Sequence, residues 1–118
     1  MEINNLVENC IKSAIEFGVA TYEAGESARK RNHLYDKNFK NFKTLKSLGS
    51  KGIDELEKLL EHSSDYVKYS AATHLLSVKE EKAKMVLNRL VSKPKGFGFN
   101  VDMLIIEWDQ GNLREYLG

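Results

Sequence analysis

The sequence predicts a single all-α domain of about six short antiparallel helices stacked as helical hairpins. Apolar residues recur at intervals of three and four along nearly the whole chain, as they do in helices that bury one face. Proline occurs once, at Pro94, so few positions oppose a helix. The breaks between the apolar patterns are short and polar, which favours neighbouring helices that run antiparallel.

Length, composition and charge restrict the class of protein. The 118 residues suit one domain, residues 1–118, which can bury a core without metal or disulfide support. The formal net charge is +1, so the overall charge indicates no particular partner. Cys10 is the single cysteine, which excludes an internal disulfide and favours a reducing compartment. With no signal-like N-terminus and no long apolar run, we expect a cytoplasmic protein that does not enter a membrane.

The first half of the chain is expected to form two long helices and one short helix. The first covers residues 3–22, where the apolar residues form one stripe, and Gly25 follows as a C-terminal stop. The second covers residues 27–48 and ends at the Gly-Ser-Lys-Gly segment 49–52, which we interpret as a helix breaker. The third is predicted over residues 53–62.

Polar residues mark the expected starts of the next two helices. Residues 63–65, Ser-Ser-Asp, supply capping groups for a fourth helix whose apolar residues extend to Val78. Ser77 and Glu80 have the spacing of a capping box, so a fifth helix is expected to start there.

The last helix is expected after the segment around Pro94, because proline and glycine oppose helix continuation. Asn100 is expected to cap this sixth helix, and Gly111 to end it before a final turn. Trp108 falls in phase with the apolar residues of this helix, which predicts a core position.

The segment Asp65–Leu76 gives the most specific evidence for the fold. It has the pattern D-x-V-[KR]-x-x-A-A-x-x-L, in which Ala71 and Ala72 allow a neighbouring helix to come close. Val67 and Val101 occupy similar places in two predicted helices and lie 34 residues apart. Repeats of about 34 to 47 residues are typical of helical solenoids, so we interpret the chain as a fragment of a HEAT/armadillo-like α-solenoid.

Three segments together resemble a bacterial family of unknown function with an armadillo-like helical fold. The first, Ala28–Lys37, is similar to an A-x-x-x-N-x-x-Y/F-D pattern of that family. The second is Asp65–Leu76, and the third, Gly98–Leu113, resembles its closing pattern of G-F, an amphipathic helix and E-W-x-x-G-x-L. The resemblance covers about residues 14–117 and implies mainly the fold.

The same resemblance implies a role for the domain. Small proteins of this general type occur beside polymorphic and contact-dependent growth inhibition toxins in bacteria, where they act as immunity proteins. We therefore expect a protein-binding module that occludes the active site of a cognate toxin domain, for instance a nuclease. Because nuclease toxins are often basic, we expect acidic contact residues. The partner-binding candidates are Asp54, Glu55, Glu57, Glu61, Asp65, Glu80 and Glu81.

A generic interaction scaffold of unknown partner is one alternative function, and a basic segment supports another, nucleic-acid binding. Residues 29–51 hold eight basic residues and one acid, Asp36. The lysines from Lys37 to Lys46 follow at steps of three, so they spread over about half the circumference of a helix and do not form a narrow stripe. A solvated surface and an acidic protein partner therefore stay open as explanations. The candidates for nucleic-acid contact are Arg29, Lys30, Arg31, Lys37, Lys40 and Lys43.

No local pattern indicates catalysis, a metal or a cofactor. Three isolated histidines and Cys10 lack the spacing of a zinc site, and residues 96–98 lack the frame of a phosphate-binding loop. We therefore expect neither an enzyme nor a metal or cofactor. Asn32, Tyr35 and Asp36 are polar residues within an aromatic segment, and we expect them to form a buried or half-buried hydrogen-bonded set that ties the second helix to its neighbours, with contact to a partner as the alternative.

Overall fold

The computed structural model describes residues 2–118 and confirms the all-α prediction. This part of the chain contains no strand and forms seven helices, one more than predicted, because the expected final turn is a one-turn helix. In chain order the helices are α1 (Ile3–Tyr22), α2 (Ala28–Lys46), α3 (Ser50–Leu59), α4 (Asp65–Leu75), α5 (Glu80–Leu90), α6 (Phe97–Asp109) and α7 (Arg114–Leu117).

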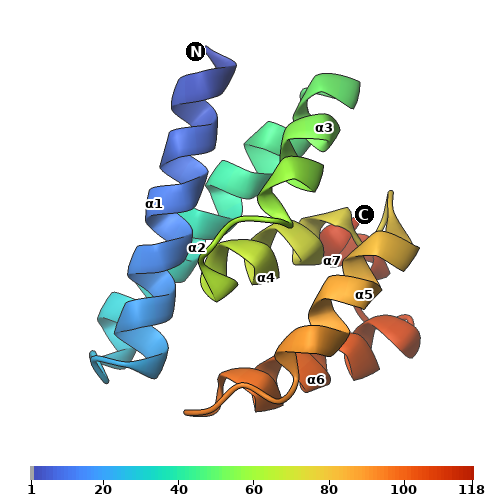
Figure 1. Ribbon diagram of the computed structural model, residues 1–118. Helices are drawn as coiled ribbons and strands as arrows, with labels where there is room; N and C mark the ends of the chain where they lie inside the picture. Colours follow the sequence, from blue (N-terminus) through green and yellow to red (C-terminus); the bar gives the residue numbers. More distant parts are fainter. Residues whose placement is uncertain (1) are drawn as a thin grey trace.

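Helix α4 lies at the centre of the molecule and packs against α1, α2, α3 and α5 (Figure 1). The hairpin of α1 and α2 lies on one side of it, and α5 and α6 lie on the other. The molecule measures 35 × 30 × 27 Å. None of the described helices is both long and apolar enough to cross a membrane.

The residues that make α4 central are those of the repeat-like segment. Val67, Ala71, Ala72 and Leu75 are completely buried, as the packing argument predicts. Small side chains at Ala71 and Ala72 leave room for the backbones of neighbouring helices, while Val67 and Leu75 fill the space between them. Val101, the predicted counterpart of Val67, is also completely buried.

Two glycines that were expected to break helices lie inside them. Helix α3 begins at Ser50, so Gly52 is in its first turn, and α6 begins at Phe97, so Gly98 is in its first turn. A Cβ on Gly52 would lie 1.8 Å from the Leu45 carbonyl oxygen, and one on Gly98 would lie 2.3 Å from the Val91 carbonyl oxygen. The absence of a side chain at these two positions permits a close approach of the preceding segment.

The predicted caps of α5 and α6 are wrong. Ser77 does not cap α5, which begins at Glu80; its hydroxyl accepts a hydrogen bond from Lys46 Nζ at 2.5 Å. Asn100 lies within α6 and donates its side-chain amide to the Tyr22 hydroxyl at 2.8 Å. For both Ser77 and Asn100, a contact with a distant segment uses the polar side chain that local spacing assigned to a cap. The fourth helix was expected to extend to Val78, but α4 ends at Leu75 and Val78 is exposed.

The predicted buried polar set of α2 is wrong in its residues. Asn32, Tyr35 and Asp36 are exposed, whereas Asn38 is buried. Asn38 Oδ1 accepts a hydrogen bond from Ser13 Oγ at 2.9 Å, and Asn38 Nδ2 donates one to Ser70 Oγ at 3.0 Å. This amide therefore ties α2 to α1 and to α4.

Trp108 is buried, as predicted. Only 3% of its surface is exposed, and its indole N–H donates to Glu80 Oε2 at 2.6 Å. The ring thus anchors α6, and its polar atom reaches the first turn of α5.

Candidate functional site

The structure contains an open groove between α3 and α5, which we call the α3–α5 groove. Its volume is about 480 Å³. Asp54 and Glu57 line it from α3, and Glu61 lines it from the turn that follows this helix. Met85 and Val86 line it from α5, and Met85 is 58% exposed. The remaining lining residues are Lys58, Leu60, Lys82 and Arg89.

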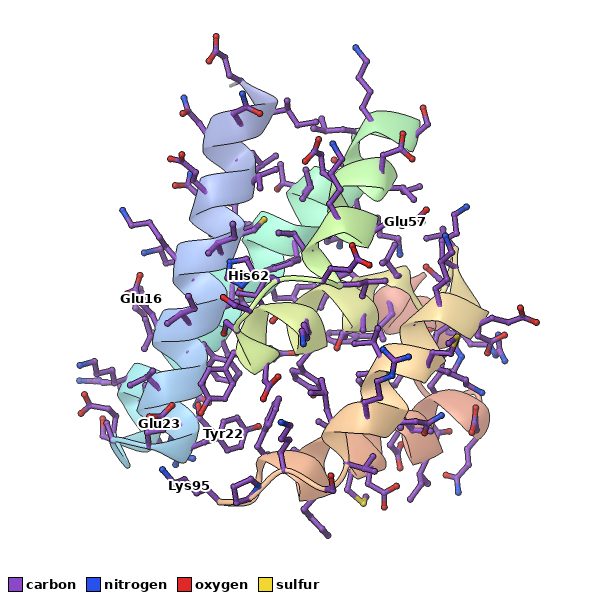
Figure 2. All side chains as sticks on the ribbon, viewed as in Figure 1. Glu16, Tyr22, Glu23, Glu57, His62 and Lys95 are labelled. Carbon is purple, nitrogen blue, oxygen red and sulfur yellow. The ribbon has the colours of Figure 1, made fainter. Side chains whose placement is uncertain are left out.

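The three acids of the groove differ in how far their charge is already compensated. Glu57 lies on the side of α3 that faces α5 (Figure 2) and pairs with Lys82 at 2.7 Å and Lys79 at 3.5 Å. The hydrogen bond from Lys82 holds the pKa of the Glu57 carboxyl below its usual value. Among residues 2–118, Asp54 and Glu61 have no ion pair. They are therefore the groove acids that are free to bind a cationic partner.

The other predicted acidic residues lie outside this groove. Glu55 pairs with Lys58 at 3.1 Å, and Asp65 pairs with Lys93 at 3.1 Å. Glu80 accepts the Trp108 indole hydrogen bond, and Glu81 is exposed in the first turn of α5. Of the seven predicted partner-binding residues, the structure brings Asp54, Glu57 and Glu61 together.

The predicted basic residues gather on the solvent side of α2. Arg29, Lys37, Lys40 and Lys43 are exposed and form no ion pair within residues 2–118. At ~3.6 residues per turn these four span an arc of about 120°.

The other basic residues of this segment are engaged or partly covered. Lys30 pairs with Glu26 at 2.7 Å, and Arg31 is half-buried. Lys46 turns inward and donates to the Leu117 carbonyl oxygen at 2.5 Å. The basic face of α2 therefore covers a narrower arc of the helix than the spacing of the lysines from Lys37 to Lys46 predicts, because the Lys46 side chain points inward.

Sequence reasoning did not predict a third feature, a partly open pocket of about 160 Å³ between α1, α2, α4, α6 and the C-terminal segment. We call it the His74 pocket. Its walls are mainly aromatic and aliphatic, with a few polar groups from α2 and α4. The lining residues are Phe17, Tyr35, Asn38, Phe39, Tyr69, Ser70, Thr73, His74, Leu104, Leu113, Tyr116 and Leu117.

His74 is the most unusual residue of this pocket. Only 5% of it is exposed, and its ring packs against Phe39 at 4.9 Å and Phe42 at 5.6 Å between centroids. Burial, followed by the positive charges of Lys46 and Lys43, lowers the pKa of His74 from 6.5 to about 3. The imidazole is therefore neutral near pH 7, with one donor and one acceptor nitrogen. Within residues 2–118 neither nitrogen has a hydrogen-bond partner from another side chain or the backbone.

Two tyrosines from distant parts of the chain close one side of the pocket. The hydroxyl oxygens of Tyr35 and Tyr116 lie 2.5 Å apart. The Tyr116 ring also stacks on Phe39 at 4.7 Å. Tyr35 is 38% exposed, so this pair forms the boundary between the pocket and solvent.

A sequence signal for the pocket was present but ambiguous. Ser70 and His74 are four residues apart on α4, so both polar side chains point to the same side of the helix. Phe42, which packs against the His74 ring, is completely buried. What brings these residues together with Tyr116 is tertiary packing.

Comparisons with protein families, characterised proteins and solved structures found no match to this chain. The resemblance to the armadillo-like bacterial family therefore stays a prediction. Residues 2–118 contain no group of three or more His, Cys, Asp or Glu side chains placed to hold a metal ion.

Proposed function

We propose that the protein is a protein-binding module and that the α3–α5 groove is its contact surface. The observation that supports this proposal is an exposed methionine, Met85, in one groove with two acids that have no ion pair within residues 2–118, Asp54 and Glu61. An apolar centre with a charged rim is the usual composition of a protein interface. Methionine is flexible and polarizable, so it adapts to the surface of a partner.

The groove favours a basic partner segment that carries an apolar side chain. Asp54 lies on α3 and Glu61 in the turn after it, so the two unpaired carboxylates lie at separate points along the groove. A partner segment with two basic residues can reach both acids, and an apolar residue of the same segment would cover Met85. Charge complementarity of this kind raises the association rate and disfavours acidic partners.

The finer proposal is an immunity protein that neutralises a basic toxin domain. The resemblance described above supports it, and the free acids of the groove agree with it. The gene next to this one is the first partner to test. We expect co-expression with its product to give a complex on size-exclusion chromatography, and expression of this protein to protect cells from that product. Failure to form a complex, together with no protection, would contradict the immunity role.

Charge reversal tests the surface itself. We expect the D54K/E61K variant to bind the partner at least about tenfold more weakly by calorimetry, because two attractive contacts become repulsive. The matched control is E8K/E16K, which reverses two exposed acids on α1 that have no ion pair within residues 2–118; Figure 2 shows Glu16 on the outer side of α1. Equal losses in both variants would assign the effect to net charge and contradict the groove.

The basic face of α2 supports a second candidate, nucleic-acid binding. It presents Arg29, Lys37, Lys40 and Lys43 with no internal ion pair. We expect any such binding to weaken steeply between low and physiological salt, because phosphate contacts release counterions. A fluorescence titration of single-stranded and duplex DNA and RNA at two salt concentrations tests it, and K40E/K43E should abolish the signal. Absence of binding at low salt removes this candidate.

A further inference from the structure

The His74 pocket is built as a ligand site, and the α3–α5 groove shares none of its residues. A buried imidazole ordinarily has a hydrogen-bond partner, because an unsatisfied polar group in an apolar environment costs about 1–3 kcal/mol. His74 is buried and lines a cavity, yet its nitrogens have no partner within the described chain. A ligand in the cavity would supply that partner.

The size of the cavity restricts the ligand to one ring. Its volume of about 160 Å³ is close to that of an engineered cavity of about 150 Å³ that holds benzene. Sites for drug-sized ligands are larger, about 300–1,000 Å³. One aromatic ring with a small substituent therefore fits, whereas a nucleotide or a peptide does not.

The walls favour an aromatic ring over an aliphatic one. Phe17 and Tyr35 meet edge to face at 5.5 Å, and Phe39 and Tyr35 stack at 6.0 Å. Rings arranged in this way offer both faces and edges to an inserted aromatic group. Leu104 and Leu113 complete the apolar surface from the opposite side of the cavity.

The polar groups of the pocket lie together on α4. Ser70 Oγ accepts from Asn38, and Thr73 Oγ1 donates to the Tyr69 carbonyl oxygen, so both are already oriented by the protein. The His74 imidazole keeps both a donor and an acceptor for a guest. None of the lining residues is a lysine, arginine, aspartate or glutamate, and His74 is neutral near pH 7, so a charged guest would be buried in the pocket without a counter-ion. The site therefore suits an uncharged molecule.

We propose that the His74 pocket binds a small neutral aromatic compound of one ring bearing a hydroxyl or N–H group, with that group hydrogen-bonded to the His74 imidazole. Phenols are the simplest members of this class. The route from solvent is a shallower recess beside α6, which shares Phe17, Tyr35, Tyr69, Leu104 and Leu113 with the pocket.

Phenol, benzene and benzoate are the probes that separate the parts of this proposal. We expect phenol to bind saturably with a Kd on the order of 1 mM, the affinity accessible to a ligand of so few atoms. Benzene should bind about tenfold more weakly, because it lacks the hydrogen bond. Benzoate should not bind. Chemical-shift titration of the labelled protein should place the phenol shifts on α2, α4 and the C-terminal segment.

Two variants and one control make the assignment specific. His74→Phe keeps an aromatic ring between Phe39 and Phe42, and it should remove the preference for phenol over benzene. Leu104→Phe should fill the cavity and abolish binding of both probes. Ile106→Phe adds a ring on the exposed side of the same helix and should leave binding unchanged.

Three outcomes would overturn the site: no saturable binding of phenol to the wild-type protein, phenol preference retained in His74→Phe, or binding retained in Leu104→Phe. The D54K/E61K variant should bind phenol normally, since the two surfaces share no residue. Loss of partner binding and loss of phenol binding can therefore be told apart.

Discussion

At the residue scale, His74 determines how stability depends on pH. Its pKa is 6.5 in an unfolded chain and about 3 in the folded protein, so between these values the unfolded state binds more protons. The free energy of unfolding should therefore fall as the pH is lowered from about 6.5 towards 3. Urea denaturation of the wild-type protein and His74→Phe across this range tests it. The wild-type curve should be the steeper one, and parallel curves would contradict the buried neutral imidazole.

Asn38 offers a second prediction at this scale. Replacing it with alanine removes the hydrogen-bond donor to Ser70 Oγ and one of the hydrogen-bond partners of Ser13 Oγ. We expect a loss of about 1–3 kcal/mol in the free energy of unfolding, because buried hydroxyls lose a partner and a small cavity forms. Asn32→Ala is the matched control on the same helix, since Asn32 is exposed, and it should change stability by less than about 0.5 kcal/mol. Equal effects in chemical denaturation would show that Asn38 is not the structural amide.

At the element scale, the first turn of α3 depends on a residue with no side chain. Replacing glycine by alanine inside a helix ordinarily stabilises it by about 0.5–1 kcal/mol. At Gly52 we expect the opposite sign, a loss of about 1–3 kcal/mol or more, because the added Cβ would meet the Leu45 carbonyl oxygen. Lys51→Ala, at the exposed neighbouring position, is the control. A thermal midpoint for Gly52→Ala at or above the wild-type value would refute this explanation.

The same turn shows how far sequence patterns could predict the elements. Periodicity predicted α1 with its observed bounds, and it placed the remaining helices correctly, because each buries a stripe of its own residues. The starts of α3 and α6 could not be found in this way. Gly52 and Gly98 have the composition of a turn, and only the close approach of the preceding backbone explains why they are helical.

The candidate sites were predictable to different degrees for related reasons. The seven acids were predicted from their charge alone, and only Asp54, Glu57 and Glu61 line one groove, because charge does not determine which side chains converge. Asn32 and Asp36 were predicted to be buried, but they are exposed and Asn38 is buried instead. A difference of a few residues along a helix changes the side to which a side chain points, and the sequence alone did not show which amide points inward. The His74 pocket combines Tyr35, His74 and Tyr116, and no local pattern relates residues so far apart.

At the scale of the whole molecule, apolar surface is divided between a core around α4 and a stripe on the outside of α6. The core residues of α4 are completely buried. On α6, Phe99, Met103 and Ile106 recur at steps of three and four and are exposed, with Phe99 at 68%. These residues lie opposite Val101 and Trp108, so they add nothing to the core.

This division predicts which substitutions the fold tolerates. We expect Leu75→Ala to lower the free energy of unfolding by about 2–5 kcal/mol, because it opens a cavity in the helix that contacts four others. Phe99→Ser combined with Ile106→Ser should lower it by less than Leu75→Ala does, since Phe99 is already 68% exposed and Ile106 39% exposed, whereas Leu75 is completely buried. It should also reduce concentration-dependent association in light scattering, because a contiguous exposed apolar stripe is removed. A large loss of stability in the α6 variant, comparable to that of Leu75→Ala, would mean that the stripe packs against a further part of the structure in solution.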